Sequence, residues 1–150
     1  MGLIKRLTKT AALSDVRHLD KLDVLKLGPD DHIIGASGAA AYYGLPVVND
    51  DLDIAVRPTR KLIGRMRKKL LPGANDGMHN HMLRDASGKL DVGTGGWFKF
   101  DEWYPKTEVA AGKYRFLNRQ GLKDFYRLLY AKYGKEKHLQ RLRMLEDGAE

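Results

Sequence analysis

The chain has 150 residues, of which 43% are hydrophobic and 31% charged, enough for one folded domain with its own core. It contains no cysteine, which excludes disulfides and thiolate-bound zinc, and no apolar run approaches the roughly 20 residues that span a bilayer. We therefore expect a soluble cytoplasmic protein with no membrane partner. The formal net charge of +8 favours polyanionic partners such as nucleic acid or nucleoside triphosphates, although basic side chains also serve solubility.

The first predicted element is a helix over residues 14 to 27. Ser14 is a suitable N-cap, and the Gly-Pro-Asp-Asp sequence of residues 28 to 31 ends the helical pattern. The apolar residues recur at helical spacing: Val16, Leu19, Leu22 and Leu25. A short strand is expected next, over residues 32 to 35.

Residues 33 to 56 carry the most information about chemistry. The spacing predicts a small-residue helix over 37 to 44 and a second strand over 51 to 56. Side chains two apart in a strand share a face, so Asp51 and Asp53 project together while Leu52 packs on the opposite side. Two adjacent carboxylates repel each other unless a divalent cation lies between them. The pattern therefore favours a magnesium site, and the alternative is a loop aspartate followed by an exposed strand aspartate.

A tight turn precedes the small-residue helix. Its residues, Gly35-Ala36-Ser37-Gly38, offer backbone N–H groups and a hydroxyl at a helix start, where phosphates bind well. Close packing of the helix on the strand would explain the same small residues. A pair of metal ions beside a phosphate-binding turn is typical of enzymes that catalyse phosphoryl or nucleotidyl transfer.

The rest of the chain predicts further helices and hairpins. A turn at residues 85 to 88 joins strands over 78 to 83 and 89 to 92, and Gly112 lies near the bend of a second hairpin over 106 to 117. Helices are expected over 59 to 70, 119 to 133 and 135 to 146. This order predicts an α+β fold with a small mixed sheet flanked by helices and a helical C-terminus. Basic residues concentrate in 57 to 69 and 132 to 143, where they bind phosphates or form solvated helix faces.

This arrangement resembles the nucleotidyltransferase superfamily typified by DNA polymerase β, which includes small bacterial enzymes of abortive-infection and toxin–antitoxin systems. The family motif is an apolar strand, a Gly-[Gly/Ser] turn, a helix, Asp-x-Asp on the next strand and a third carboxylate on a later strand. Here Ala36 separates Gly35 from Ser37, where the family has adjacent residues. The resemblance implies Asp91 as the third carboxylate and a minimal nucleotidyltransferase fold.

The resemblance also implies roles for the other site residues. Asp51, Asp53 and Asp91 would be catalytic and bind Mg²⁺ or Mn²⁺, and Asp91 would help to deprotonate the acceptor hydroxyl. Nucleotide-binding residues would be those of the turn and a lysine on a late helix: Gly35, Ser37, Gly38 and Lys132. The alternative for Asp91 is an exposed strand carboxylate paired with Lys89.

The implied organisation is a single domain over residues 1 to 150, with an N-terminal helix in 1–30, a sheet core in 31–117 and C-terminal helices in 118–146. The implied activity transfers a nucleoside monophosphate from an NTP such as ATP to a hydroxyl of RNA (for example tRNA), of a protein or of a small molecule. Two alternatives remain open. One is a catalytically inactive module that binds nucleic acid or protein, and the other is an antitoxin-like partner protein.

Overall fold

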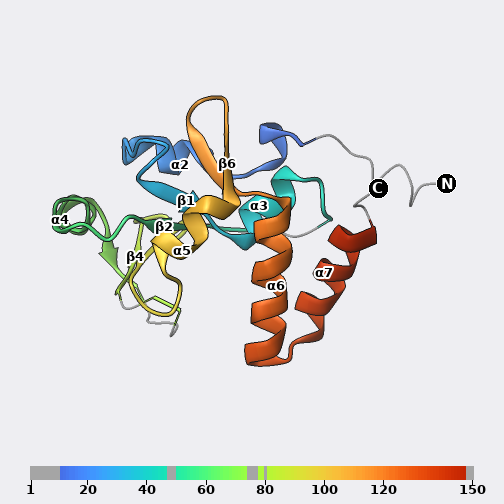
Figure 1. Ribbon diagram of the computed structural model, residues 1–150. Coiled ribbons are helices and arrows are strands. Elements are labelled where there is room, and N and C mark those ends of the chain that lie inside the picture. The colour runs from blue at the N-terminus through green and yellow to red at the C-terminus, as the bar shows by residue number, and fades with distance from the viewer. Residues whose placement is uncertain (1–10, 47–49, 74–77, 80, 148–150) are drawn as a thin grey trace.

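The computed structural model describes residues 11–46, 50–73, 78–79 and 81–147, and its centre is a mixed β-sheet (Figure 1). Seven strands lie in the order β3-β4-β5-β2-β1-β7-β6. β2 pairs with β5, and β1 with β7, in parallel, whereas all other neighbours are antiparallel. The strands are β1 (His32–Ile34), β2 (Leu52–Val56), β3 (Leu71–Pro72), β4 (His81–Arg84), β5 (Leu90–Thr94), β6 (Thr107–Ala110) and β7 (Tyr114–Leu117).

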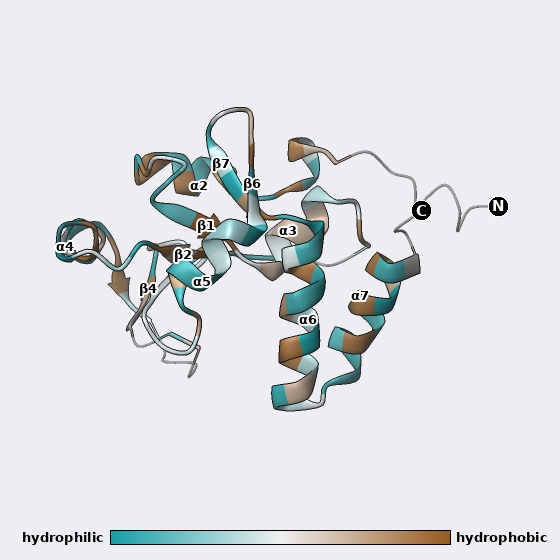
Figure 2. Ribbon diagram, viewed as in Figure 1, coloured by the Kyte–Doolittle hydropathy of each residue, from teal (hydrophilic) through white to brown (hydrophobic). Residues whose placement is uncertain are grey.

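Helices flank this sheet, so the predicted α+β class with a helical C-terminus is confirmed. The last two helices pack side by side as an antiparallel pair, and both carry hydrophobic and hydrophilic residues (Figures 1 and 2). The described α-helices are α2 (Leu19–Val24), α3 (Ala36–Tyr42), α4 (Arg60–Lys69), α5 (Phe100–Trp103), α6 (Arg119–Tyr133) and α7 (Glu136–Asp147). Two 3-10 turns, η1 (Leu13–Asp15) and η2 (Tyr104–Lys106), complete the described elements.

The predicted alternation in β2 holds. Leu52, Ile54 and Val56 are buried, whereas Asp53 between them is exposed. The strand begins at Leu52, so Asp51 lies just before it rather than within it as predicted. In the same way β4 starts later than predicted, and β5 continues to Thr94 beyond the predicted end. These shifts follow from pairing between strands, which fixes strand ends independently of the hydrophobic pattern.

The single helix predicted over residues 14 to 27 is wrong. The chain forms η1, becomes extended at Val16, and starts α2 only after His18, which has a left-handed φ of 69°. The His18 imidazole makes a 2.8 Å hydrogen bond with the carbonyl oxygen of Asp50, a contact that sequence periodicity does not reveal. The apolar positions are nevertheless buried, since Val16, Leu22 and Leu25 all lie in the core.

The C-terminal helices agree closely with their predicted bounds. The Asn118 side chain accepts a hydrogen bond of 2.7 Å from the N–H of Gly121, which caps α6. Gly134 ends the helix in the left-handed conformation. Across the described residues, no helix is both long enough and apolar enough to cross a membrane.

Candidate active site

The turn between β1 and α3 lies directly beside β2. The N–H of Gly35 donates a 2.7 Å hydrogen bond to the carbonyl oxygen of Asp53, and a Cβ at position 35 would lie only 3.1 Å from that oxygen. The first intrahelical hydrogen bond of α3 runs from the Ala39 N–H to the Gly35 carbonyl. The N–H groups of Ala36, Ser37 and Gly38 therefore belong to the first turn of α3, and Ala36 and Ser37 line the cavity described below.

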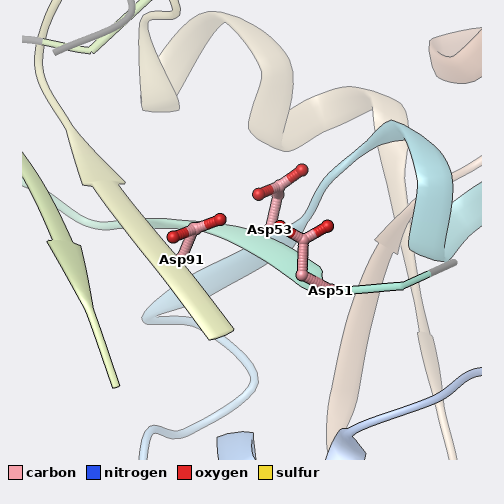
Figure 3. Close-up of side chains that lie close together, drawn as sticks. All are labelled: Asp51, Asp53 and Asp91. Carbon is pink, nitrogen blue, oxygen red and sulfur yellow. The ribbon is translucent and has the colours of Figure 1, made fainter. Parts of the chain in front are cut away.

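Three of the predicted site residues meet on one side of the sheet. Asp53 and Asp91 are direct partners in the parallel β2–β5 register, and Asp51 lies two residues before Asp53. One carboxylate oxygen from each of the three lies within 4.8 Å of the others. Figure 3 shows the three carboxylates projecting to the same side of the two strands. Sequence positions that are 38 residues apart (91 minus 53) thus form one cluster of oxygen atoms.

The charges of this cluster are crowded. Burial raises the pKa of Asp51, and a hydrogen bond and the negative charge of Asp91 raise this pKa further. The carboxylate of Asp91 is itself only 7% exposed. A cation placed among the three would relieve this repulsion, and the ligand atoms are hard oxygens of the kind that Mg²⁺ and Mn²⁺ prefer. The three side chains therefore fit a divalent cation.

An arginine that sequence reasoning missed binds the third carboxylate. Arg84 on β4 is the cross-strand partner of Asp91. Its Nε donates to one oxygen of Asp91 at 2.6 Å and a terminal guanidinium nitrogen donates to the other at 3.2 Å. The predicted alternative of a pair with Lys89 is replaced by this bidentate pair. The hydrogen bond and charge of Asp91 raise the pKa of Arg84, and Asp51 and Asp53 add to the shift.

The carboxylates line a cavity of about 370 Å³, which is large enough for a small organic ligand. Gly35, Ala36 and Ser37 contribute to the same wall as the aspartates. Apolar side chains from α6 and the loop after β5 form much of the remainder: Phe98, Phe125 and Leu129. The cavity thus offers an apolar surface next to an anionic cluster and the first turn of a helix.

α7 supplies polar side chains to the same cavity. Lys137, His138 and Arg141 all line it. His138 is buried, and its Nδ1 atom has no hydrogen-bond partner among the described residues. Burial lowers the pKa of His138, as do the positive charges of Lys137 and Arg141, so the imidazole is neutral near pH 7. No other residue of α7 lines the cavity in the described part of the chain, and the sequence pattern did not predict that these three side chains face the carboxylates.

Tyr126 of α6 contacts the start of α3. Its hydroxyl lies 3.5 Å from the carbonyl oxygen of Ala36, and burial raises its pKa to about 12. The phenol therefore stays protonated and remains a hydrogen-bond donor. The guanidinium of Arg141 lies 5.9 Å from the centre of the Tyr126 ring, so Tyr126 contacts both α7 and the start of α3.

The remaining predicted site residues are placed differently. Gly38 is buried, and a Cβ there would lie 2.6 Å from Ile34 and 3.0 Å from Leu52, so its small size serves helix–strand packing. Lys132 is exposed and is not among the residues that line the cavity. Its ammonium lies 4.8 Å from the centre of the Trp97 ring, which is a cation–π contact. Of the predicted nucleotide-binding residues, the structure brings Gly35 and Ser37 to the cavity.

Comparison of the chain with protein-family models, with curated proteins and with solved structures produced no match. The function is therefore inferred from the geometry of the carboxylates and the cavity.

Proposed function

We propose that this protein is a metal-dependent nucleotidyltransferase, which transfers a nucleoside monophosphate from an NTP to a hydroxyl. One observation carries the proposal: carboxylate oxygens of Asp51, Asp53 and Asp91 lie within 4.8 Å of one another at the wall of a cavity of about 370 Å³. The order of elements supports it, because β1, the turn, α3, β2 and β5 follow the family motif in sequence. We accordingly assign the sheet and its helices to the nucleotidyltransferase fold.

Each wall of the cavity has a role in this proposal. The three aspartates would hold Mg²⁺ or Mn²⁺, and the bound cations would supply Lewis-acid neutralisation of the phosphates. The first-turn N–H groups of α3 and the Ser37 hydroxyl donate to phosphate oxygens. Arg141 and Lys137 approach from the α7 side, and they take the place that the sequence had suggested for Lys132. The apolar side chains between these walls leave room for the base or ribose.

Asp91 has a second role. As the third carboxylate of the family motif, it would accept the proton of the attacking hydroxyl. The Arg84 guanidinium fixes the orientation of this carboxylate through two hydrogen bonds. The acceptor hydroxyl belongs to RNA such as tRNA, to a protein or to a small molecule, and the setting proposed is the cytoplasm, in a toxin–antitoxin or abortive-infection system.

The proposal is tested by the midpoint of thermal unfolding, Tm, measured with Mg²⁺ or Mn²⁺ and each NTP. We expect the metal and the nucleotide together to raise the Tm of the wild type, because both bind only the folded state. The Asp51→Asn/Asp53→Asn variant should lose this rise, and Asp20→Asn, which changes an exposed carboxylate on α2, should keep it. Incubation with radiolabelled NTPs and total RNA or lysate then identifies the acceptor. A rise that survives in Asp51→Asn/Asp53→Asn would contradict the proposal.

The bidentate Arg84–Asp91 pair favours one second candidate, a catalytically inactive binding module. In that case the guanidinium takes the place of the cation permanently. The two functions differ in the response of Arg84→Gln. If the wild type binds no Mn²⁺ and Arg84→Gln does, the arginine occupies the metal site and the module is inactive. If the wild type binds Mn²⁺, the pair with Arg84 coexists with the metal or opens for it.

A further inference from the structure

The helix α4 presents an unusual concentration of positive charge. Residues 57 to 70 contain no acidic residue. Leu62 and Met66 of α4 are buried, and five basic side chains are exposed on the rest of its surface: Arg60, Lys61, Arg67, Lys68 and Lys69. Within the residues that the structure describes, none of these five forms an ion pair, whereas basic residues on other elements do. The charge of α4 is therefore available to an outside partner.

The strand register connects the end of α4 to the carboxylates. Leu71 on β3 pairs with Arg84 on β4, Arg84 pairs with Asp91 on β5, and Asp91 pairs with Asp53 on β2. These four residues form one row across the sheet. Neighbouring strands lie about 4.8 Å apart, so Leu71 is about 10 Å from the backbone of Asp91 and about 14 Å from that of Asp53.

The cations at the end of α4 also lie on the same side of this row as Asp51. β3 and β5 are both antiparallel to β4, and β5 is parallel to β2, so β3 runs in the same direction as β2. Lys69 precedes Leu71 by two residues, as Asp51 precedes Asp53. The last turn of α4 and the start of β2 therefore lie towards the same ends of the strands. Figure 1 shows α4 on the β4 side of the molecule.

The surface between the two charged regions suits a single nucleic-acid strand. The side chain of Leu71 is 58% exposed on the edge strand, where it offers an apolar contact to a base or sugar. Arg84 follows it, with a half-exposed side chain. Grooves for single strands combine cations that track the phosphates with apolar or planar side chains that contact bases. The negative charge of a chain of phosphates is complementary to the positive charge of α4. An acceptor of mixed charge would be less complementary.

We propose that the last turn of α4 binds the phosphate backbone of a single-stranded nucleic acid whose terminal hydroxyl reaches Asp91. The bound strand runs from Arg67, Lys68 and Lys69 over Leu71 and Arg84 to the carboxylates. The role of its terminal hydroxyl rests on the proposed function, whereas binding of the strand to α4 does not. This assigns the polynucleotide class to the acceptor and gives α4 a binding role.

Fluorescence polarisation of short 5′-labelled single strands with a free 3′ hydroxyl, made as RNA and as DNA, tests the binding step. Arg67→Gln/Lys68→Gln/Lys69→Gln should weaken binding of the preferred strand by about tenfold and reduce the slope of log Kd against log salt by about 2. The matched control, Lys21→Gln/Lys135→Gln/Arg143→Gln, removes the same charge from α2, the α6–α7 connection and α7, and it should stay within about twofold of the wild type. Equal loss in both variants, or no binding to either kind of strand, would overturn the assignment.

Photo-cross-linking tests the direction of the strand. A strand with 4-thiouridine at its 3′ end should cross-link to the peptides that contain Arg84 or Asp91, and cross-links to α4 instead would mean that the strand runs in the opposite direction. Cross-links confined to α6 and α7 would overturn the path. Failure of the proposed function gives a different result: binding that depends on α4 would persist, and Mg²⁺-dependent transfer of nucleotide to the strand would be absent from the wild type.

Discussion

At the scale of single residues, the crowded carboxylates of the candidate site lower the stability of the folded protein. Three carboxylates are held together by β2 and β5, and the pKa of Asp51 is raised by burial and by Asp91. A raised pKa means that the folded state favours the neutral carboxyl group, so its ionisation lowers the free energy of unfolding. Sites that bind ligands commonly hold such unfavourable charge at the expense of stability.

The first prediction concerns the loss of stability that the ionised Asp51 carboxylate causes. Without metal at pH 7, Asp51→Asn should raise the free energy of unfolding by about 1 kcal/mol, because the amide cannot ionise. The gain should fade as the pH falls through the raised folded-state pKa of Asp51, and it should be absent below the ordinary Asp value of 3.8, where the wild-type carboxyl is protonated in both states. Urea denaturation in EDTA measures both the gain in the free energy of unfolding and its dependence on pH. A variant that is less stable than the wild type at pH 7 would contradict the account of crowding.

The second prediction separates two glycines. Gly38→Ala should destabilise the protein by about 1–3 kcal/mol, since the new Cβ would lie 2.6 Å from Ile34 and 3.0 Å from Leu52. Gly64→Ala is the control, because no atom lies within 4 Å of a Cβ there and the residue is inside α4. This change should stabilise the protein by about 0.5–1 kcal/mol. Thermal unfolding of both variants measures the contrast, and equal effects would refute the packing role of Gly38.

At the scale of elements, the β4–β5 hairpin positions the third carboxylate. The Asp85 side chain accepts hydrogen bonds from the Ser87 hydroxyl and from the N–H groups of Lys89 and Leu90. Burial raises the pKa of Asp85, but these hydrogen bonds outweigh burial and the net shift is downward. The ionised side chain therefore ties the turn to the start of the strand that carries Asp91.

The third prediction follows from this turn. Asp85→Ala should lower the free energy of unfolding by about 1 kcal/mol at pH 7. A lowered pKa contributes stability above the ordinary value of 3.8 that disappears as the pH falls through the folded-state pKa. The difference in Tm between wild type and variant should therefore shrink in strong acid. A difference that is constant over the whole pH range would show that the charge of Asp85 has no part in it.

Local signals decided which elements the sequence could predict. Asn118 and Gly134 mark the ends of α6, and Thr59 caps α4 through the N–H of Leu62, so these helices agree with expectation. The N-terminal segment was mispredicted because its helical spacing competes with a tertiary contact of His18. The alternation around Asp53 is likewise local, and it placed two carboxylates on one face. The Arg84–Asp91 pair and the inward face of α7 depend on register and packing, which no local pattern encodes.

At the scale of the whole molecule, charge is organised around the sheet. The carboxylates lie on the central strands β2 and β5, the basic helix α4 leads to the edge strand β3, and α7 brings Lys137 and Arg141 to the cavity. A chain with a net charge of +8 thus has a cluster of carboxylates on its central strands. In the proposed function, this arrangement would attract anionic substrates from a distance and leave cations to bind among the carboxylates.

Electron paramagnetic resonance of Mn²⁺ tests the central claim, that Asp51, Asp53 and Asp91 form one divalent-cation site, most directly. In a titration without nucleotide, because a triphosphate would itself bind Mn²⁺, the wild type should remove Mn²⁺ from the free signal with saturation. Asp53→Asn and Asp91→Asn should each weaken this binding at least about tenfold, as loss of a metal ligand does, and Asp20→Asn should not. Binding of Mn²⁺ that is unchanged in Asp53→Asn and Asp91→Asn would contradict the claim.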